Sequence, residues 1–233
     1  EELTPHLDRL AADGVRFERF YANTSTTLNS HTSMMTGRDP HQHGVPRNGF
    51  PVLDGIPTLA ERLKGQGYHT IGVVGAMALE RAMGLDRGFD VYDDAIEGKQ
   101  HIMHQDRAER VVDRALARVD ARDDAAPLFL FVHLYDMHGP FAAPEPWRER
   151  FADPAYDGIF KRIGWKRKRI GPKLARGRAT PAELDYGASL YLGEAAYTDH
   201  HVGRLLDALQ ARGLLDEALV VITADHGQVL SEL

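Results

Sequence analysis

The sequence contains no cysteine. Disulfide bonds and thiolate metal sites are therefore excluded within these 233 residues, and the redox compartment is left open. No apolar run approaches the roughly 18 residues that a membrane-spanning helix needs. The formal net charge of -6 argues against binding to bulk nucleic acid.

The composition that is present is typical of a globular protein, with 43% hydrophobic and 27% charged residues. A length of 233 residues is suited to one large α/β domain. The chain begins without methionine and stops a few residues after its most informative motif. We therefore predict a single α/β catalytic domain over residues 1–233 that is truncated at both ends.

Strand-like and helix-like segments alternate along the chain, which favours a mostly parallel (mixed) central sheet with helices on both faces. Strands are predicted over residues 15–22, 68–74, 128–132 and 219–223. The run LFLFV at 128–132 is too short for a helix and too continuous for a surface strand. We therefore expect it to be a central, buried strand.

Capping signals delimit the helices. Thr4-Pro5 begins a helix that Gly14 ends, and Asn29 or Ser30 caps a short helix that runs to Gly37. Capping boxes predict further helices, one from Thr58 and Glu61 to about Lys64 and a long one from Thr180 and Glu183. Another helix is expected near residues 104–118.

One segment breaks the alternating pattern. Residues 161–178 contain nine basic residues and no acidic one. We interpret residues 158–178 as a basic insertion loop. A solvated surface loop is one reading, and a lid that attracts an anionic substrate or a lipid headgroup surface is another.

Three segments carry side chains suited to chemistry. Asp225-His226-Gly227 directly follows a predicted strand, where functional groups of open α/β sheets collect. A carboxylate beside an imidazole suits zinc, manganese or a similar divalent ion, although such a pair is also found in structural roles.

The second segment is a hydroxyl-rich loop, TSTTLNSHTSMMTGRDPHQHGV at residues 24–45, which leads into a short helix. Main-chain N–H groups at a helix start attract anions, and a hydroxyl there becomes a nucleophile if a metal lowers its pKa. The alternative is that these hydroxyls only cap and form turns. The third segment, FVHLYDMHGP, places His133, Asp136 and His138 at a strand end.

Together and in this order, these segments resemble the sulfatase-like branch of the alkaline phosphatase superfamily. TPHLDRLAADGVRF matches the pattern that precedes the family's nucleophile loop. The family's TGR-P-HGV stretch is matched by residues 36–45, and GYHTIGVVG, GLDRGFDVYDD and the closing TADHG also fit. The resemblance covers nearly the whole chain and implies an alkaline phosphatase-like α/β fold.

Aligning the TGR motif places Thr27 at the family's nucleophile position. Asn29 then stands where the family has proline, Ser30 at its serine and His31 at its arginine. Sulfatases convert cysteine or serine to formylglycine, and threonine cannot give that aldehyde because of its extra methyl. Threonine resembles instead the family members that act on phosphoesters.

By the same resemblance, Asp225 and His226 bind a divalent cation that Thr27 also touches. Zinc, manganese and calcium are the expected ions, and their identity is left open. The family draws further acidic ligands from a strand just upstream of Glu1, so we expect the metal site to be incomplete and the isolated fragment to be inactive. His138 matches the family's substrate-contacting histidine and is expected to be catalytic.

The remaining residues have supporting roles by this resemblance. Asp136 is expected to orient His138, to bind the metal or to contact substrate. His31, Arg47 and Asn48 are predicted to line the anion pocket, with Arg38 and Ser30 supporting the nucleophile loop. His41, His43 and Asp199 are interpreted as structural.

The predicted function is therefore a metal-dependent hydrolase that cleaves phosphate or phosphonate esters through Thr27. Its partner is a small anionic ester substrate, which can be linked to a lipid or a glycan, and no nucleic acid is expected. A sulfuric ester hydrolase is the alternative, and a noncatalytic binding domain of the same fold is a third. Compartment and oligomeric state are left open.

Overall fold

A computed structural model describes residues 2–97, 105–123, 125–163 and 167–228. The chain divides into two compact units. The first, which we call the helical unit, contains the described residues up to Arg16, Asp136–Asp207 and Gln228. The second, the sheet unit, contains the described residues within Phe17–Tyr135 and Ala208–Gly227.

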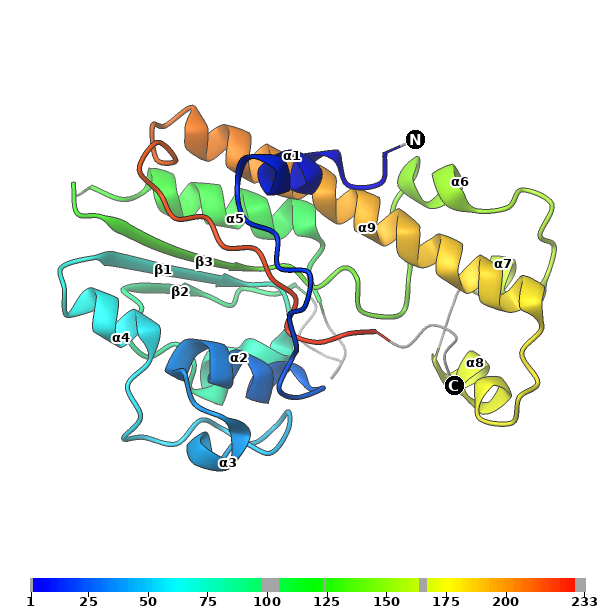
Figure 1. The fold of residues 1–233 in the computed structure, drawn as a ribbon, viewed down its shortest axis with the longest axis horizontal. Helices are drawn as coiled ribbons and strands as arrows, with labels where there is room; N and C mark the ends of the chain where they lie inside the picture. Colours follow the sequence, from blue (N-terminus) through cyan, green and yellow to red (C-terminus); the bar gives the residue numbers. More distant parts are fainter. Residues whose placement is uncertain (1, 98–104, 124, 164–166, 229–233) are drawn as a thin grey trace. The chain divides into compact units, whose positions relative to one another are not determined.

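The sheet unit is built on a parallel sheet whose described strands have the order β2-β1-β3. Helix α5 covers one face of this sheet, and α2 and α4 lie on the other (Figure 1). The α/β class with helices on both faces is therefore confirmed. The elements are α2 (Thr27–Thr36), α3 (Pro40–His43), α4 (Leu59–Lys64), β1 (His69–Val74), η1 (Met77–Leu79), η2 (Arg81–Met83), β2 (Val91–Asp93), α5 (Ala108–Asp120) and β3 (Leu128–His133).

The central strand is β1, in which every residue after His69 is buried. Gly72 lies opposite Tyr92 in β2, and a Cβ atom at Gly72 would come within 2.8 Å of the Tyr92 ring. Only glycine therefore lets this ring pack flat against the strand. Leu28, Val74 and Leu79 belong to the core cluster that joins α2 to the sheet.

The prediction of a central strand at 128–132 is correct in type and wrong in place. The segment forms β3, which pairs with β1 and stands at the end of the strand order among the described residues. All of its residues except His133 are half-buried. An apolar run indicates that a strand is hydrophobic, but it does not indicate whether the strand pairs with one or two neighbouring strands.

Two predicted strands are wrong. Residues 15–22 and 219–223 form no strand, and most of their apolar side chains are exposed, with Tyr21 81% and Val221 72% exposed. Their composition favours the extended conformation. A strand also requires a neighbouring strand for its N–H and C=O groups, and in the described part of the chain neither segment belongs to the sheet.

The helix signals were more accurate. Helix α4 spans the predicted residues, and its capping box is complete, with Thr58 Oγ1 accepting from Glu61 N at 3.1 Å. Helix α5 begins at Ala108, later than predicted, and residue 104 lies outside the described residues. The predicted N-cap of α2 is wrong, because the helix begins at Thr27 with Thr26 as N-cap.

The helical unit contains α1 (Pro5–Asp13), α6 (Trp147–Phe151), α7 (Ile159–Ile163), α8 (Arg167–Leu174) and all but the last residues of α9 (Pro181–Gln210). Helix α9 starts at the predicted capping box, where Thr180 N donates to Glu183 Oε2 at 3.0 Å. Asp199 caps α1, accepting from Leu7 N at 2.8 Å and from His6 N at 3.1 Å. Asp199 therefore has a structural role, in agreement with its interpretation from the sequence.

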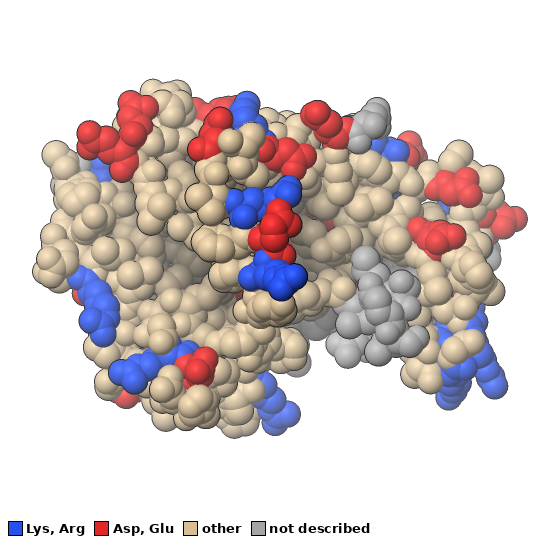
Figure 2. All heavy atoms as spheres, viewed as in Figure 1, with Lys and Arg blue, Asp and Glu red and all other residues tan. Residues whose placement is uncertain are grey.

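The predicted basic insertion loop is largely helical, because α7 and α8 fall within it. Figure 2 shows a group of Lys and Arg side chains in the region of α8 and the turn that follows it. Lys173 in α8 forms an ion pair with Glu183, so at least this cation has an internal partner.

None of the helices within the described ranges combines the length and apolarity needed to cross a membrane.

Candidate active site

The candidate nucleophile, Thr27, is the first residue of α2 and is 2% exposed. The next amide, Leu28 N, donates to Asn48 Oδ1 at 2.7 Å. Asn48 therefore satisfies one of the free N–H groups at the start of α2. Its side-chain NH₂ group is left for other partners, and its predicted contact with substrate stays a prediction.

The turn that leads into Thr27 is held by Asn29. Its Oδ1 accepts from the hydroxyls of Thr24 at 2.9 Å and Thr26 at 2.8 Å, and its Nδ2 donates to Pro46 O at 3.1 Å. These hydroxyls thus have structural partners, whereas the Thr27 hydroxyl is not used in this network. The network also explains why Thr26 makes no side-chain cap bond.

Two residues of α2 connect Thr27 to the predicted metal-binding segment. Ser30 Oγ donates to the main-chain oxygen of Asp225 at 2.6 Å. His31 Nδ1 lies 2.8 Å from Thr27 O and 3.7 Å from Asp225 Oδ2. The structure therefore brings together Thr27, Ser30, His31 and Asp225, which the sequence placed in two distant motifs.

Asp225 and His226 present groups that fit a divalent cation. His226 Nδ1 lies 2.8 Å from Gly227 O, so this nitrogen carries the proton and Nε2 keeps a lone pair. Nε2 lies 3.4 Å from Asp225 Oδ2, which places the two ligand atoms on the same side of the turn. A group of three or more candidate His, Cys, Asp or Glu ligands is not found among the described residues.

The imidazoles around Thr27 are held neutral. Burial lowers the pKa of His31, against the opposing effects of Asp225 and the Thr27 carbonyl. Burial and the neighbouring His31 hold the pKa of His133 well below its usual value. The two rings meet edge to face with centroids 4.8 Å apart. A neutral His31 is a hydrogen-bonding group, and it does not supply the positive charge of the arginine that the resemblance places there.

Tyr135 is a site residue that the sequence reasoning missed. Its ring lies 5.5 Å from that of His133, which packs against His31. Burial raises the pKa of Tyr135, the side chain of Thr27 lowers it, and the Asp225 carboxylate raises it. Its position in FVHLYDMHGP, beside the predicted ligands, was the only signal available.

The predicted arginines lie at the surface. The guanidinium of Arg47 stacks over the Phe50 ring at 5.2 Å from its centroid, and Arg47 is exposed. Arg38 lines a cavity of about 290 Å³ together with Ser30 and Asp225. Arg38 therefore adjoins the candidate site.

Asp136 and His138 belong to the helical unit. Asp136 is buried, and His138 Nδ1 lies 2.8 Å from Gly139 O. Their roles toward substrate stay predictions.

His43 has a structural arrangement. Its Nδ1 accepts from Val45 N at 3.1 Å, so Nε2 carries the proton and faces Ser33 Oγ at 3.0 Å. An imidazole that donates to a serine does not act as its base. The pair joins α3 to α2.

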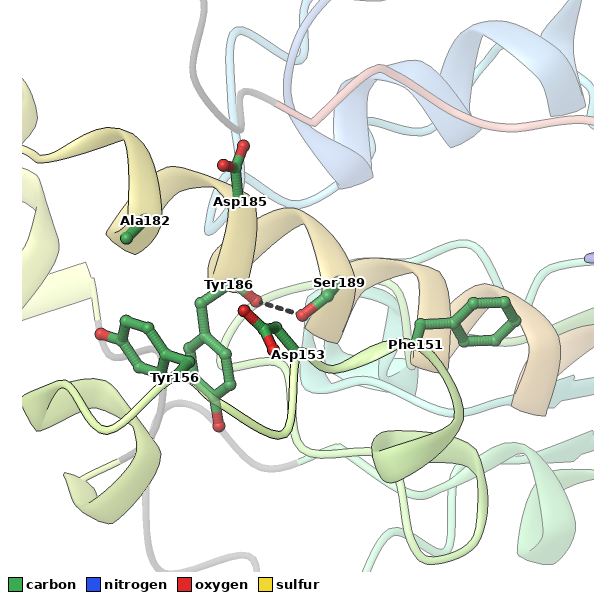
Figure 3. Close-up of a pocket in the computed structure, with 7 residues that line it drawn as sticks. All are labelled: Phe151, Asp153, Tyr156, Ala182, Asp185, Tyr186 and Ser189. Atoms are coloured by element: carbon green, nitrogen blue, oxygen red, sulfur yellow. Dashed lines mark hydrogen bonds between the residues drawn. The ribbon is translucent and has the colours of Figure 1, made fainter.

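A separate cavity of about 250 Å³ lies within the helical unit (Figure 3). Its walls include the stacked rings of Tyr156 and Tyr186, 4.1 Å apart, and Ser189, whose hydroxyl donates to Tyr186 O at 2.7 Å. None of the predicted site residues lines it.

Comparison with known proteins agrees with this architecture. The model of the Sulfatase family matches residues 1–232. An arylsulfatase of Clostridium perfringens is 22% identical over 98% of this chain and 59% of its own length. An N-acetylglucosamine-6-O-sulfatase of Bacteroides thetaiotaomicron is 26% identical over 98% of this chain and 54% of its own length.

Among solved structures, a phosphonate monoester hydrolase from Silicibacter pomeroyi shares the fold. It has a TM-score of 0.68 and 22% sequence identity, over 96% of this chain and 57% of that one. This chain belongs to the sulfatase family. It spans less than two thirds of the length of these relatives.

Proposed function

We propose that this chain forms part of a metal-dependent ester hydrolase in which Thr27 is the nucleophile and phosphate or phosphonate esters are the substrates. The observation that carries the proposal is the convergence of Thr27 and Asp225 through Ser30 and His31. A hydroxyl at the start of a helix is thereby held beside a carboxylate and an imidazole of metal-ligand type.

Asp225 and His226 Nε2 would hold the cation, with zinc, manganese and calcium as the candidates. Such an ion, when bound, lowers the pKa of a neighbouring hydroxyl and neutralises anionic charge. We propose that Thr27 is also a ligand, and that further oxygen ligands from outside the described residues complete the coordination. The chain's own contribution is to orient the ligand atoms, through Ser30 for Asp225 and through Gly227 O for His226.

The reaction is a double displacement. Thr27 Oγ bonds to phosphorus while the bond from phosphorus to the leaving alcohol breaks, and the alcohol takes up a proton. Water then attacks the phosphorylated Thr27, which regenerates the hydroxyl and releases the acid. His138 is proposed to stabilise the charge on the nonbridging oxygens. Because Thr27 is 2% exposed, an ester reaches its hydroxyl only if the side chains around it move.

Sulfate ester hydrolysis is the second candidate, and membership of the sulfatase family favours it. Two features oppose it. The chain has no cysteine that could be converted to the formylglycine of sulfatases. The threonine at the nucleophile position cannot be converted to it either. A noncatalytic domain is the third candidate. The retention of Thr27, Asp225 and His226 argues against it.

The test is an ester panel on the protein expressed from its complete reading frame, supplied in turn with zinc, manganese, magnesium and calcium. Substrates are nitrophenyl phosphate, bis-nitrophenyl phosphate, nitrophenyl phenylphosphonate and nitrophenyl sulfate. We expect turnover of the phosphorus esters that falls about 1000-fold or more in Thr27→Ala. Ser25→Ala is the matched control, because Ser25 is an exposed neighbouring hydroxyl.

Sulfate turnover without phosphorus ester turnover would reject the substrate assignment. Loss of activity in Ser25→Ala with retention in Thr27→Ala would reject the assignment of the nucleophile. The absence of any metal-dependent turnover would favour the noncatalytic domain.

A further inference from the structure

We propose that the cavity of the helical unit binds a small organic cation of the substituted-ammonium class. The cavity has a volume of about 250 Å³, and none of the residues assigned to ester hydrolysis lines it. The proposal is therefore independent of the proposed function. Drug-sized ligands occupy pockets of about 300–1,000 Å³, so a cavity of this volume suits a smaller molecule.

One wall of the cavity is a single face of α9. Ala182, Asp185, Tyr186 and Ser189 line it, and their spacing of i, i+3, i+4 and i+7 places them on the same side of the helix. The end of α6 and the loop that follows it supply the remaining lining residues. Tyr186 also belongs to the hydrophobic core cluster of this unit, so this wall is fixed before a ligand binds.

The charged residues that line the cavity are both acidic, Asp153 and Asp185. Among the described residues no lysine or arginine lines it, and neither carboxylate forms an ion pair with the described part of the chain. Asp153 Oδ1 accepts from Ala155 N at 2.8 Å, which restrains this carboxylate. The cavity therefore repels anions and attracts a positively charged ligand.

The polar group between the rings and α9 also favours a cation. Ser189 Oγ donates its proton to Tyr186 O at 2.7 Å, so the hydroxyl has lone pairs and no proton left for a ligand. Figure 3 shows this bond and the Asp153 carboxylate near it.

The rings of Tyr156 and Tyr186 indicate which cation fits. They stack with centroids 4.1 Å apart and are 8% and 7% exposed. Aromatic rings attract organic ammonium groups through their faces, and quaternary ammonium ligands are recognised in this way. A metal ion fits less well, because no group of three or more His, Cys, Asp or Glu ligands is found within the described ranges.

The test is a ligand-observed NMR titration of the complete protein with tetramethylammonium chloride in a constant background of sodium chloride. tert-Butanol, a neutral molecule of similar shape, is the comparison ligand. We expect saturable binding of tetramethylammonium, and binding of tert-butanol that is about 10-fold weaker or more. Equal binding of the two ligands, or no saturable binding of tetramethylammonium, would overturn the proposal.

Variants locate the binding. Asp153→Asn keeps the acceptor for Ala155 N and removes the charge, so we expect affinity for tetramethylammonium to fall about fivefold. Asp157→Asn is the matched control, because Asp157 is an exposed carboxylate of the same loop that does not line the cavity. It should change affinity less than about twofold. Equal losses in the two variants would show that only the general negative charge attracts the ligand.

A second pair tests the aromatic wall. Tyr186→Phe keeps the ring face and should bind within about twofold of wild type, whereas Tyr186→Leu should weaken binding about fivefold or more. Circular dichroism establishes whether both variants fold, and the aspartate variants decide the outcome if Tyr186→Leu does not. Wild-type affinity in a folded Tyr186→Leu would reject the cavity as the binding site.

Discussion

The hydroxyl of Ser30 donates a 2.6 Å hydrogen bond to the main-chain oxygen of Asp225, 195 positions further along the chain. This bond directly connects the helix that carries the candidate nucleophile to the segment that carries the candidate metal ligands. It uses the main chain of Asp225 and does not occupy the carboxylate, of which Oδ1 accepts from His226 N at 3.0 Å. Its removal therefore tests whether the two segments act as one site.

We expect Ser30→Ala to weaken divalent metal binding by about 10-fold to 100-fold, the usual cost of losing a residue that orients a ligand. Calorimetric titration of the metal-free protein with zinc or manganese measures this affinity. Ser33→Ala is the control on the same helix, because Ser33 contacts His43 and not Asp225. Equal metal affinity in Ser30→Ala and wild type would show that the contact does not orient the ligands.

Asp93, at the end of β2, is 5% exposed and accepts from two arginines of α5. Arg114 and Arg118 lie 2.5 Å and 2.8 Å from its two carboxylate oxygens. Arg114 keeps Asp106 as a second partner and the Arg118 side chain is 48% exposed. Because Asp93→Asn removes the charge from buried hydrogen bonds to arginine, we expect a loss of about 2 kcal/mol in the free energy of unfolding.

Urea unfolding measures this loss. Asp120→Asn is the control, because the Asp120–Arg212 pair lies at the surface and its loss should change stability little. A loss no larger than that of the control would mean that solvent replaces the bonds to Asp93.

Acid stability should depend on Asp90, whose Oδ1 lies 2.7 Å from the Lys64 ammonium. Burial raises its pKa, but hydrogen bonds from Lys64 and Thr70 outweigh burial and lower the pKa from 3.8 to about 2. A carboxyl whose pKa is depressed by folding stabilises the fold above its unfolded pKa, and this contribution is lost as pH falls through the folded pKa.

The window is therefore from about pH 4 down to about pH 2. Because the Asp90 side chain is 32% exposed, solvent screening reduces the contribution to about 1 kcal/mol. Unfolding measured across this window should show a shallower decline for Asp90→Asn than for wild type. Parallel curves would exclude Asp90 as the titrating group.

The exposed apolar residues of the segments at 17–21 and 219–222 should make the 233-residue chain self-associate. In these segments Phe20 is 67% exposed, Leu219 is 90% exposed and Val221 is 72% exposed. Exposed apolar segments in extended conformation pair with other chains. We expect binding of a hydrophobic dye and an apparent mass that rises with concentration in analytical ultracentrifugation.

Leu219→Lys with Val221→Lys should reduce both signals. Leu59→Lys is the control, since Leu59 is an exposed apolar residue of α4, outside these segments. If Leu59→Lys reduced dye binding and self-association more, the surface responsible for self-association would lie outside these two segments.

Local signals in the sequence determined much of this fold. The capping box of Thr58 and the one of Thr180 fixed the starts of α4 and α9, because a cap depends on residues within one turn of helix. The alternation of strand and helix gave the α/β class, and the order of motifs gave the family. The same motifs predict Thr27 and Asp225 as site residues, and their roles stay predictions.

Only the tertiary structure decided which of these residues meet. The sequence has no means of showing that Ser30 bonds the main chain of Asp225 or that His31 packs against His133, because these contacts join segments that are distant along the chain. The same limit explains why the strands predicted at 15–22 and 219–223 do not form. Their residues favour an extended backbone, but a strand exists only when a neighbouring chain segment accepts its hydrogen bonds.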